Sequence, residues 1–184
     1  MQSERVKKRQ NQRGYVHIYT GDGKGKTTAA LGVAFRAMGW QMRTYIGQFL
    51  KGMDYGELHA AKLVAPYITI EQFGKDTMIR AQDPPDPEDV QLAQKGLERA
   101  KEVLHSGVYD IVVLDEINIA NRFGLISTED MLAFIKDKPE HVELIFTGRN
   151  APSEVVQAAH LVSEVLQIKH YYHEGVEARW GLER

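Results

Sequence analysis

Short apolar runs alternate with stretches of helical periodicity along most of this chain. Between several of the runs, apolar residues recur at steps of three and four, which is the spacing of one helix face. The alternation predicts an α/β fold, with a mostly parallel sheet of about six strands and helices on both faces. The runs rich in β-branched and aromatic residues, which predict the strands, are 15–19, 43–49, 67–72, 110–114, 142–146 and 165–171.

The best-marked helix follows the third predicted strand. Asp86 is a suitable N-cap, Pro87 suits the first helical position, and Gly107 suits the end of the helix. The apolar stripe of this helix belongs in the core. It consists of Val90, Ala93, Leu97, Ala100 and Leu104.

Two further helix starts lie in the second half of the chain. Ser127 with Asp130 three residues later is a capping-box pattern, and it predicts a helix through Ile135. Pro152 predicts the start of another helix, which runs toward Leu161.

The composition limits the classes of function. The 184 residues are 43% hydrophobic and 26% charged, which fits one domain with a sizeable core. A net charge of -2 argues against a nucleic-acid partner, because proteins that neutralise phosphates carry a basic excess. No apolar run reaches the roughly 18 residues of a membrane span. Without cysteine there is no disulfide or thiol nucleophile, and we expect a soluble cytoplasmic protein with no membrane partner.

Only the first segment departs from this charge balance. Residues 1–14 carry five basic side chains against Glu4 alone, with little apolar surface to anchor them. We expect a basic, flexible arm followed by one domain at 15–184. The arm is either a solvated tail or a segment that folds over a bound anionic ligand.

A glycine-rich segment joins the first predicted strand to a helical pattern. Gly21, Gly23 and Gly25 allow backbone N–H groups to converge on phosphate oxygens. Lys26 reaches the phosphates as a point charge, and Thr27 offers its hydroxyl to Mg²⁺ or Mn²⁺. The segment departs from the usual phosphate-loop pattern, because Thr20 stands at the first glycine position. The remaining predicted ATP-binding residues of the loop are Thr20, Asp22, Lys24 and Thr28.

Two carboxylates follow the fourth predicted strand. Asp115 and Glu116 stand where the second metal-binding element of a phosphate-loop protein belongs. The carboxyl ends of parallel strands meet at one edge, so these carboxylates face Lys26 and Thr27 there. The sequence therefore predicts a P-loop NTPase-like domain that binds ATP, with Thr27, Asp115 and Glu116 as metal ligands.

Several short motifs in this order resemble the ATP:corrinoid adenosyltransferase family. They are residues 20–28, 48–52, 113–116 and 147–149, with tail signals at 161–165, 169–170 and 175–176. Each motif is weak alone, but the combination is fairly specific and covers nearly all of 15–181.

The resemblance implies transfer of the 5′-deoxyadenosyl group of ATP to the cobalt of a reduced corrinoid, with release of triphosphate, in adenosylcobalamin biosynthesis or salvage. Co(I) is itself a strong nucleophile, so the reaction needs no protein base. Lys26 and Glu116 are the predicted catalytic residues, because they face the leaving triphosphate or its metal. The resemblance also implies a homodimer and an electron-donating reductase.

Three other residues each have two possible roles, one functional and one structural. Lys51 and Arg149 follow strands on the ligand side, where each contacts ATP or is a solvated surface charge. Phe73 matches a position that faces the corrin in the family, but the favoured interpretation is an ordinary strand-end core residue. A tryptophan that some members carry nearby is missing here.

Two other functions fit the phosphate loop. A P-loop ATPase or small-molecule kinase would direct Glu116 at a water or an acceptor hydroxyl and release ADP. A non-catalytic nucleotide sensor or nucleic-acid binder would bind ATP and use the basic arm to hold a partner, without adenosyl transfer.

Overall fold

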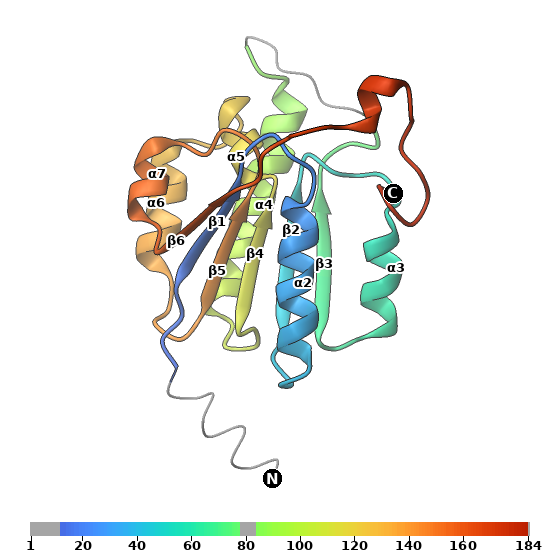
Figure 1. The fold of residues 1–184 in the computed structure, drawn as a ribbon. Coiled ribbons are helices and arrows are strands. Elements are labelled where there is room, and N and C mark those ends of the chain that lie inside the picture. The colour runs from blue at the N-terminus through green and yellow to red at the C-terminus, as the bar shows by residue number, and fades with distance from the viewer. Residues whose placement is uncertain (1–11, 78–83, 184) are drawn as a thin grey trace.

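The computed structural model describes residues 12–77 and 84–183. Within them, one parallel sheet of six strands has the order β3-β2-β4-β5-β1-β6 (Figure 1). The predicted α/β fold is confirmed. The strands are β1 (Val16–Thr20), β2 (Thr44–Phe49), β3 (Ile68–Phe73), β4 (Ile111–Asp115), β5 (Glu143–Thr147) and β6 (Leu161–Glu164).

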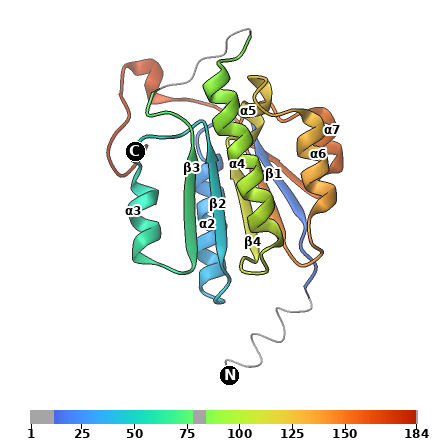
Figure 2. The same ribbon diagram turned by 180° about the vertical axis from the view of Figure 1, so that it is seen from behind.

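Helices cover both faces of the sheet. One face carries α2 (Lys26–Met38) and α3 (Gly56–Leu63). Figure 2, from behind, shows the opposite face covered by the larger group. That group is α4 (Pro87–His105), α5 (Ile117–Arg122), α6 (Thr128–Asp137) and α7 (Ser153–Ala158).

The predicted helix starts are confirmed where a side chain caps the backbone. Asp86 accepts a hydrogen bond from the Glu88 amide, with Pro87 at the first helical position. Ser127 and Asp130 form the reciprocal capping box of α6. These caps satisfy amides that have no partner inside the helix, which explains why they can be read from the sequence.

The predicted last strand, 165–171, is wrong. Strand β6 lies earlier, at Leu161–Glu164, because the preceding helix ends at Ala158 rather than near Leu161. Val165 N still donates to Thr20 O, but β1 turns there into the glycine-rich loop and offers no further edge. The chain then runs on as a C-terminal tail, residues 165–183, with one 3₁₀ turn at Tyr171–Glu174.

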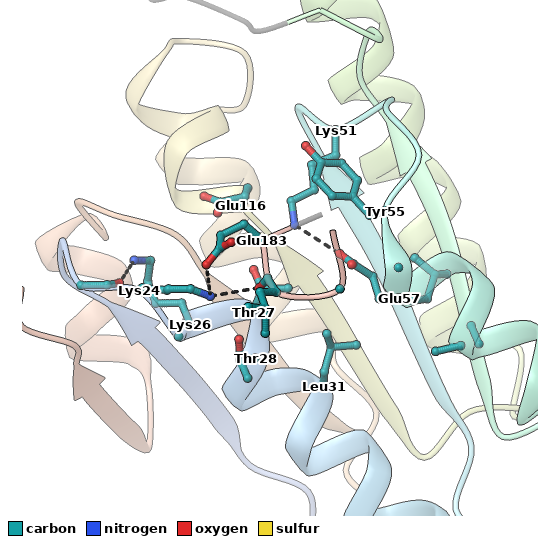
Figure 3. A pocket seen from close by; sticks show the side chains of 18 of the residues that line it. Lys24, Lys26, Thr27, Thr28, Leu31, Lys51, Tyr55, Glu57, Glu116 and Glu183 are labelled. Carbon is teal, nitrogen blue, oxygen red and sulfur yellow. Dashed lines mark hydrogen bonds and ion pairs between the residues drawn. The ribbon is translucent and has the colours of Figure 1, made fainter. Parts of the chain in front are cut away.

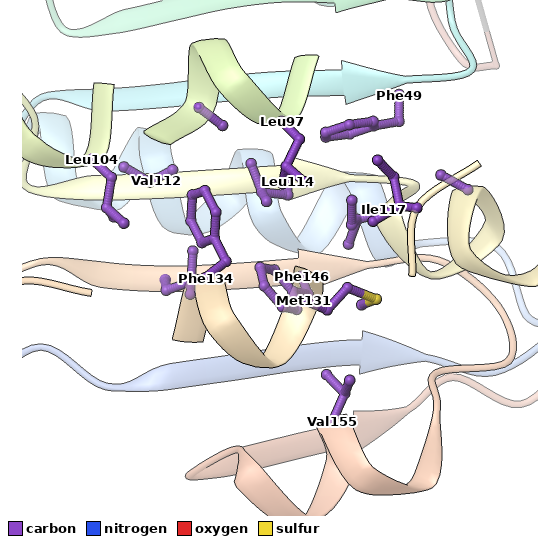
Figure 4. Packing of buried hydrophobic residues seen from close by; sticks show 14 of the residues in the cluster. Phe49, Leu97, Leu104, Val112, Leu114, Ile117, Met131, Phe134, Phe146 and Val155 are labelled. Atoms are coloured by element: carbon purple, nitrogen blue, oxygen red, sulfur yellow. The ribbon is translucent and has the colours of Figure 1, made fainter. Parts of the chain in front are cut away.

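The main hydrophobic core lies between the sheet and α4 to α7 (Figure 4). Phe134 of α6 packs on Phe146 of β5, with ring centroids 6.3 Å apart. A smaller cluster on the α2 face includes Ala30, Ile46 and Val113.

The predicted basic arm falls mostly on residues 1–11, outside the described residues. Within 12–77 and 84–183, no helix combines the length and apolar character needed to cross a bilayer.

Candidate active site

A cavity of about 710 Å³ opens at the carboxyl edge of the sheet. The loop after β1 and the first turn of α2 form one side, and the segment after β2, together with α3 and β3, forms the other. Figure 3 shows Lys51, Tyr55 and Glu57 across the cavity from the side chains of the loop. The predicted loop residues 22–28 all line it, together with Lys51, Glu116 and Arg149.

The glycine-rich loop wraps around the ammonium of Lys26. Gly21 and Gly25 have φ of 92° and 124°, which residues with a Cβ rarely adopt. Lys26 Nζ donates to the carbonyls of Gly21 and Gly23, both at 2.8 Å. Burial lowers the pKa of Lys26, and the Glu116 carboxylate opposes that change in part. A buried cation held inside a glycine-rich loop is suited to bind an anion.

Asp115, at the end of β4, is fully buried and accepts from four donors. Its Oδ1 accepts from Thr27 Oγ1 at 2.8 Å and Thr147 Oγ1 at 2.6 Å. Its Oδ2 accepts from Lys51 Nζ at 2.8 Å and Gln48 Nε2 at 3.3 Å. Burial would raise the pKa of Asp115, but the Lys51 ammonium and these hydrogen bonds lower it. Asp115 is thus an anion that fixes the orientation of Thr27 and Lys51.

Glu116 turns away from the strand into the cavity. Its φ is 63°, in the left-handed region, and its amide donates to Thr147 Oγ1 at 2.9 Å. Burial, and next the neighbouring Asp115 carboxylate, raise the pKa of Glu116. A left-handed residue other than glycine costs about 1–2 kcal/mol, so the surrounding contacts must hold this conformation.

The oxygen atoms at this edge fit a hard divalent cation. Thr27 offers a hydroxyl and Glu116 a carboxylate to the cavity, whereas both oxygens of the predicted ligand Asp115 already accept from protein donors. Across the described residues, no group of three or more His, Cys, Asp or Glu side chains could hold a metal ion alone. Mg²⁺ is commonly bound through one or two carboxylates together with substrate phosphates, so this smaller set suits a metal that arrives with a nucleotide.

Lys51 is held in place from three sides. Leu50, at the end of β2, has φ of 62° and turns the chain toward Asp115. The Lys51 ammonium lies 5.3 Å from the Tyr55 ring centroid and 3.8 Å from Glu57 Oε1. Burial opposes its charge, but Asp115 raises the pKa of Lys51, so the residue stays a cation.

Sequence reasoning missed Tyr55, Glu57 and the contact of Gln48. Gln48 Nε2 donates to Glu57 Oε1 at 2.9 Å, which links β2 to the first turn of α3. The only signal was the motif at 48–52, which ends before these residues.

The C-terminal tail forms a wall of the cavity, which the sequence did not predict. Gly23 N donates to Val165 O at 2.7 Å, and a Cβ at Gly21 or Gly23 would lie within 2.6 Å of tail backbone oxygens. Lys24 Nζ donates to Leu182 O at 3.1 Å and lies 3.7 Å from a Glu183 carboxylate oxygen. The loop glycines are therefore needed for tail packing as well as for access to a phosphate.

Comparison with known proteins agrees with this geometry. The family model described as ATP:corrinoid adenosyltransferase BtuR/CobO/CobP matches residues 12–183. This chain belongs to that family.

Curated relatives of this adenosyltransferase support the assignment. A corrinoid adenosyltransferase from Sinorhizobium sp is 36% identical over 180 residues, covering 94% of this chain and 81% of the relative. Corrinoid adenosyltransferase CobA from Salmonella typhimurium is 31% identical, covering 97% of this chain and 90% of the relative. Among solved structures, flagellar accessory protein FlaH from Methanocaldococcus jannaschii has a TM-score of 0.55 at 12% identity. The match covers 86% of this chain and 75% of the FlaH chain, which shows a shared fold.

Two predicted site residues of the adenosyltransferase lie in contrasting places. Arg149 is at the rim, with its side chain 53% exposed and Nε 3.8 Å from Asp22 Oδ1. Phe73 is 7% exposed and packs on Phe49 and against Gly96 of α4, on the face away from the cavity. Phe73 is therefore a core residue, as one of its two interpretations predicted. The contact between Phe73 and the corrin remains a prediction. Little of the phenyl ring is exposed to a bound macrocycle.

Proposed function

We propose that this adenosyltransferase uses the phosphate loop and the Thr27–Asp115–Glu116 edge to hold ATP by its triphosphate while a reduced corrinoid attacks C5′. The observation that carries the proposal is the buried Lys26 ammonium, enclosed by the loop and sharing one cavity with the Glu116 carboxylate. That arrangement suits a held leaving group.

The chemistry of the transfer agrees with the residues present. The electron pair of Co(I) forms the bond to C5′, and the C5′–O bond breaks with its pair retained by the α-phosphate oxygen. No protein base is required, because no proton moves in this step. Lys26 and the loop amides stabilise the negative charge that develops on the leaving triphosphate.

Thr27 and Glu116 would hold Mg²⁺, which when bound neutralises phosphate charge. Asp115 already accepts from four donors, so we assign it to orienting the Thr27 hydroxyl and the Lys51 ammonium. Lys24, Lys51 and Arg149 add positive charge around the phosphates.

The proposal extends to the setting of the enzyme. Family membership supports a homodimer, a cytoplasmic location and an electron-donating reductase that supplies Co(I). The acceptor is either a corrinoid biosynthetic intermediate or salvaged cobalamin.

The test is anaerobic incubation with Mg-ATP and chemically reduced cob(I)alamin. We expect a light-sensitive adenosylcorrinoid in the corrin spectrum and an equal amount of inorganic triphosphate by anion-exchange chromatography. A control without reductant should give neither product, because the unreduced cobalt lacks the attacking electron pair. ADP and phosphate with an unchanged corrinoid would reject the proposal in favour of an ATPase.

A further inference from the structure

The segment after β5 carries Arg149 to the rim of the active-site cavity. Residues 148–151 form this segment, which we call the Arg149 turn. Its backbone has a positive φ on each side of the arginine, 123° at Gly148 and 56° at Asn150. Such a backbone persists only where the surrounding structure fixes it. The contacts that fix the turn therefore decide which part of the cavity Arg149 can reach.

On the α5 side, Asn118 holds the turn from within the core. Asn118 is fully buried, and its Nδ2 donates to Gly148 O at 2.9 Å. The two residues pack so closely that a Cβ at Gly148 would lie 3.1 Å from Asn118 Cβ. Asn118 Oδ1 is buried and has no hydrogen-bond partner among the described residues. An unsatisfied buried acceptor opposes folding, so this asparagine is better explained by the place it gives to the turn than by stability.

On the β1 side, Thr20 holds the turn through its hydroxyl. Thr20 Oγ1 accepts a hydrogen bond from Ala151 N at 3.3 Å, and Gly148 N donates to Tyr19 O at 3.2 Å. Thr20 is a predicted ATP-binding residue, but its side chain does not line the cavity. The glycine that usually stands at this position of a phosphate loop would offer no such acceptor.

The turn is also linked to the carboxylates of the site. Thr147, the residue before the turn, accepts from Glu116 N at 2.9 Å and donates to Asp115 Oδ1 at 2.6 Å. The Arg149 turn is thus joined to the end of β1, the end of β4 and the start of α5. These are the segments that carry the phosphate loop and the predicted metal ligands.

The Arg149 side chain is not fixed by contacts of its own head group with the loop. Its Nε lies 3.8 Å from Asp22 Oδ1, which is too long for a hydrogen bond, and the side chain is 53% exposed. A long exposed side chain samples several rotamers, so its backbone limits what it reaches. Arg149 lines the cavity together with Lys26, and a planar guanidinium suits contacts with two phosphate oxygens at once.

We infer that Thr20 and Asn118 are positioning residues, which hold the Arg149 turn so that the Arg149 guanidinium contacts the triphosphate. The inference rests on the proposed function, in which the triphosphate is the leaving group. Neither positioning side chain touches the ligand, because Asn118 is fully buried and Thr20 does not line the cavity. The departure of this phosphate loop from the usual first glycine is then explained by the use of the Thr20 hydroxyl as an acceptor.

A double-mutant cycle tests the role of Thr20. By calorimetry with inorganic triphosphate and Mg²⁺, we expect Arg149→Ala to weaken binding by about tenfold and Thr20→Val by about threefold or more. In the Arg149→Ala background, Thr20→Val should change the affinity by less than about twofold, because no guanidinium remains to be positioned. Thr20→Ser keeps the acceptor and should recover most of the affinity that Thr20→Val loses. Additive effects in the double variant, or no effect of Thr20→Val, would overturn the role of Thr20.

A second cycle tests Asn118. Asn118→Ala removes the donor to Gly148 O, and we expect triphosphate to bind about threefold or more weakly, again only where Arg149 is present. The matched control is Asn121→Ala on the same helix. Asn121 Nδ2 donates to Ile126 O at 3.0 Å, away from the turn, so this variant should leave triphosphate affinity within about twofold. Thermal unfolding checks that each variant is folded. Equal losses of affinity in Asn118→Ala and Asn121→Ala would mark a general effect on folding and overturn the role of Asn118.

These outcomes separate from the fate of the proposed reaction, because triphosphate binding is measured without a corrinoid. Losses that depend on Arg149 in a protein that makes no adenosylcorrinoid would keep the positioning role and reject the transferase. Adenosyl transfer by a protein in which the losses are additive would do the reverse.

Discussion

The two faces of the sheet differ in how completely they are packed. On the α4 to α7 face, large side chains such as Leu97, Phe134 and Phe146 are at most 2% exposed. On the α2 and α3 face, the helices contribute mainly alanine, and the partly exposed Ile68 and Ile70 border a cavity.

The two faces of the sheet therefore have separate roles. Close packing of large side chains supplies much of a domain's stability, and a face filled in this way has no room for a ligand. The open face gives up part of that burial and gains a pocket at the carboxyl edge of the strands. Substitutions on the first face should therefore lower stability, and those on the second should lower binding or activity.

The largest expected effect is on the packed face. Phe134→Ala should lower the free energy of unfolding by about 3–5 kcal/mol, because it leaves a cavity beside Phe146. The matched control is Phe35→Ala on α2, 68% exposed, which should cost less than about 0.5 kcal/mol. Denaturant unfolding measures both. Similar costs for the two variants would contradict the division between the faces.

On the open face, Lys26→Ala should lower activity and leave stability unchanged. Removing a cation that stabilises the leaving triphosphate should slow adenosyl transfer by about 10²- to 10³-fold. Stability should not fall, because burial already lowers the pKa of Lys26 and its charge is costly without a ligand. Single-turnover kinetics and thermal unfolding check the two parts, with the exposed Lys62→Ala of α3 as control. A large loss of stability with unchanged turnover would contradict this role.

The phosphate loop and the carboxylates could be predicted because their chemistry is local. Glycines beside Lys26 and Thr27, between a strand and a helix, leave few other uses for the segment, and Asp115 and Glu116 directly end an apolar strand. Even so, the sequence could not show that donors occupy both oxygens of Asp115, because those donors come from three separate parts of the chain.

The C-terminal tail and α3 could not be predicted for two physical reasons. Residues 165–171 have strand-like composition, but β1 provides no edge beyond Thr20, so tertiary pairing overrides local preference. Helix α3 is short, and the small residues by which it lines the cavity give a weak apolar pattern.

A smaller effect is expected of Glu116→Gln, which should change how the stability of the protein depends on pH. Burial and Asp115 raise the pKa of Glu116 above 4.5 against the opposing effect of Lys51, Lys26 and Arg149. Between pH 4.5 and the raised pKa, the unfolded chain has released a proton that the folded chain retains, so the stability of the wild type falls as pH rises. Glu116→Gln should lack that fall and be the more stable protein at neutral pH. Chemical denaturation across the acidic to neutral range measures it, and parallel curves for the two proteins would contradict the raised pKa.

A small effect on stability is expected from Leu31→Ala, and this variant compares the two faces most directly. Leu31 lines the active-site cavity and is partly exposed, so its truncation enlarges an open cleft and creates no closed cavity. We expect a cost below about 1 kcal/mol, against about 2–5 kcal/mol for Leu97→Ala, which is 2% exposed on the buried face of α4. Leu31→Ala should also weaken ATP binding several-fold while Leu97→Ala leaves the affinity of the folded protein unchanged. Denaturant unfolding and calorimetry give both quantities for each variant. If Leu31→Ala cost as much stability as Leu97→Ala, the α2 face would be a second packed core, and the cavity would no longer be explained by an incomplete helix layer.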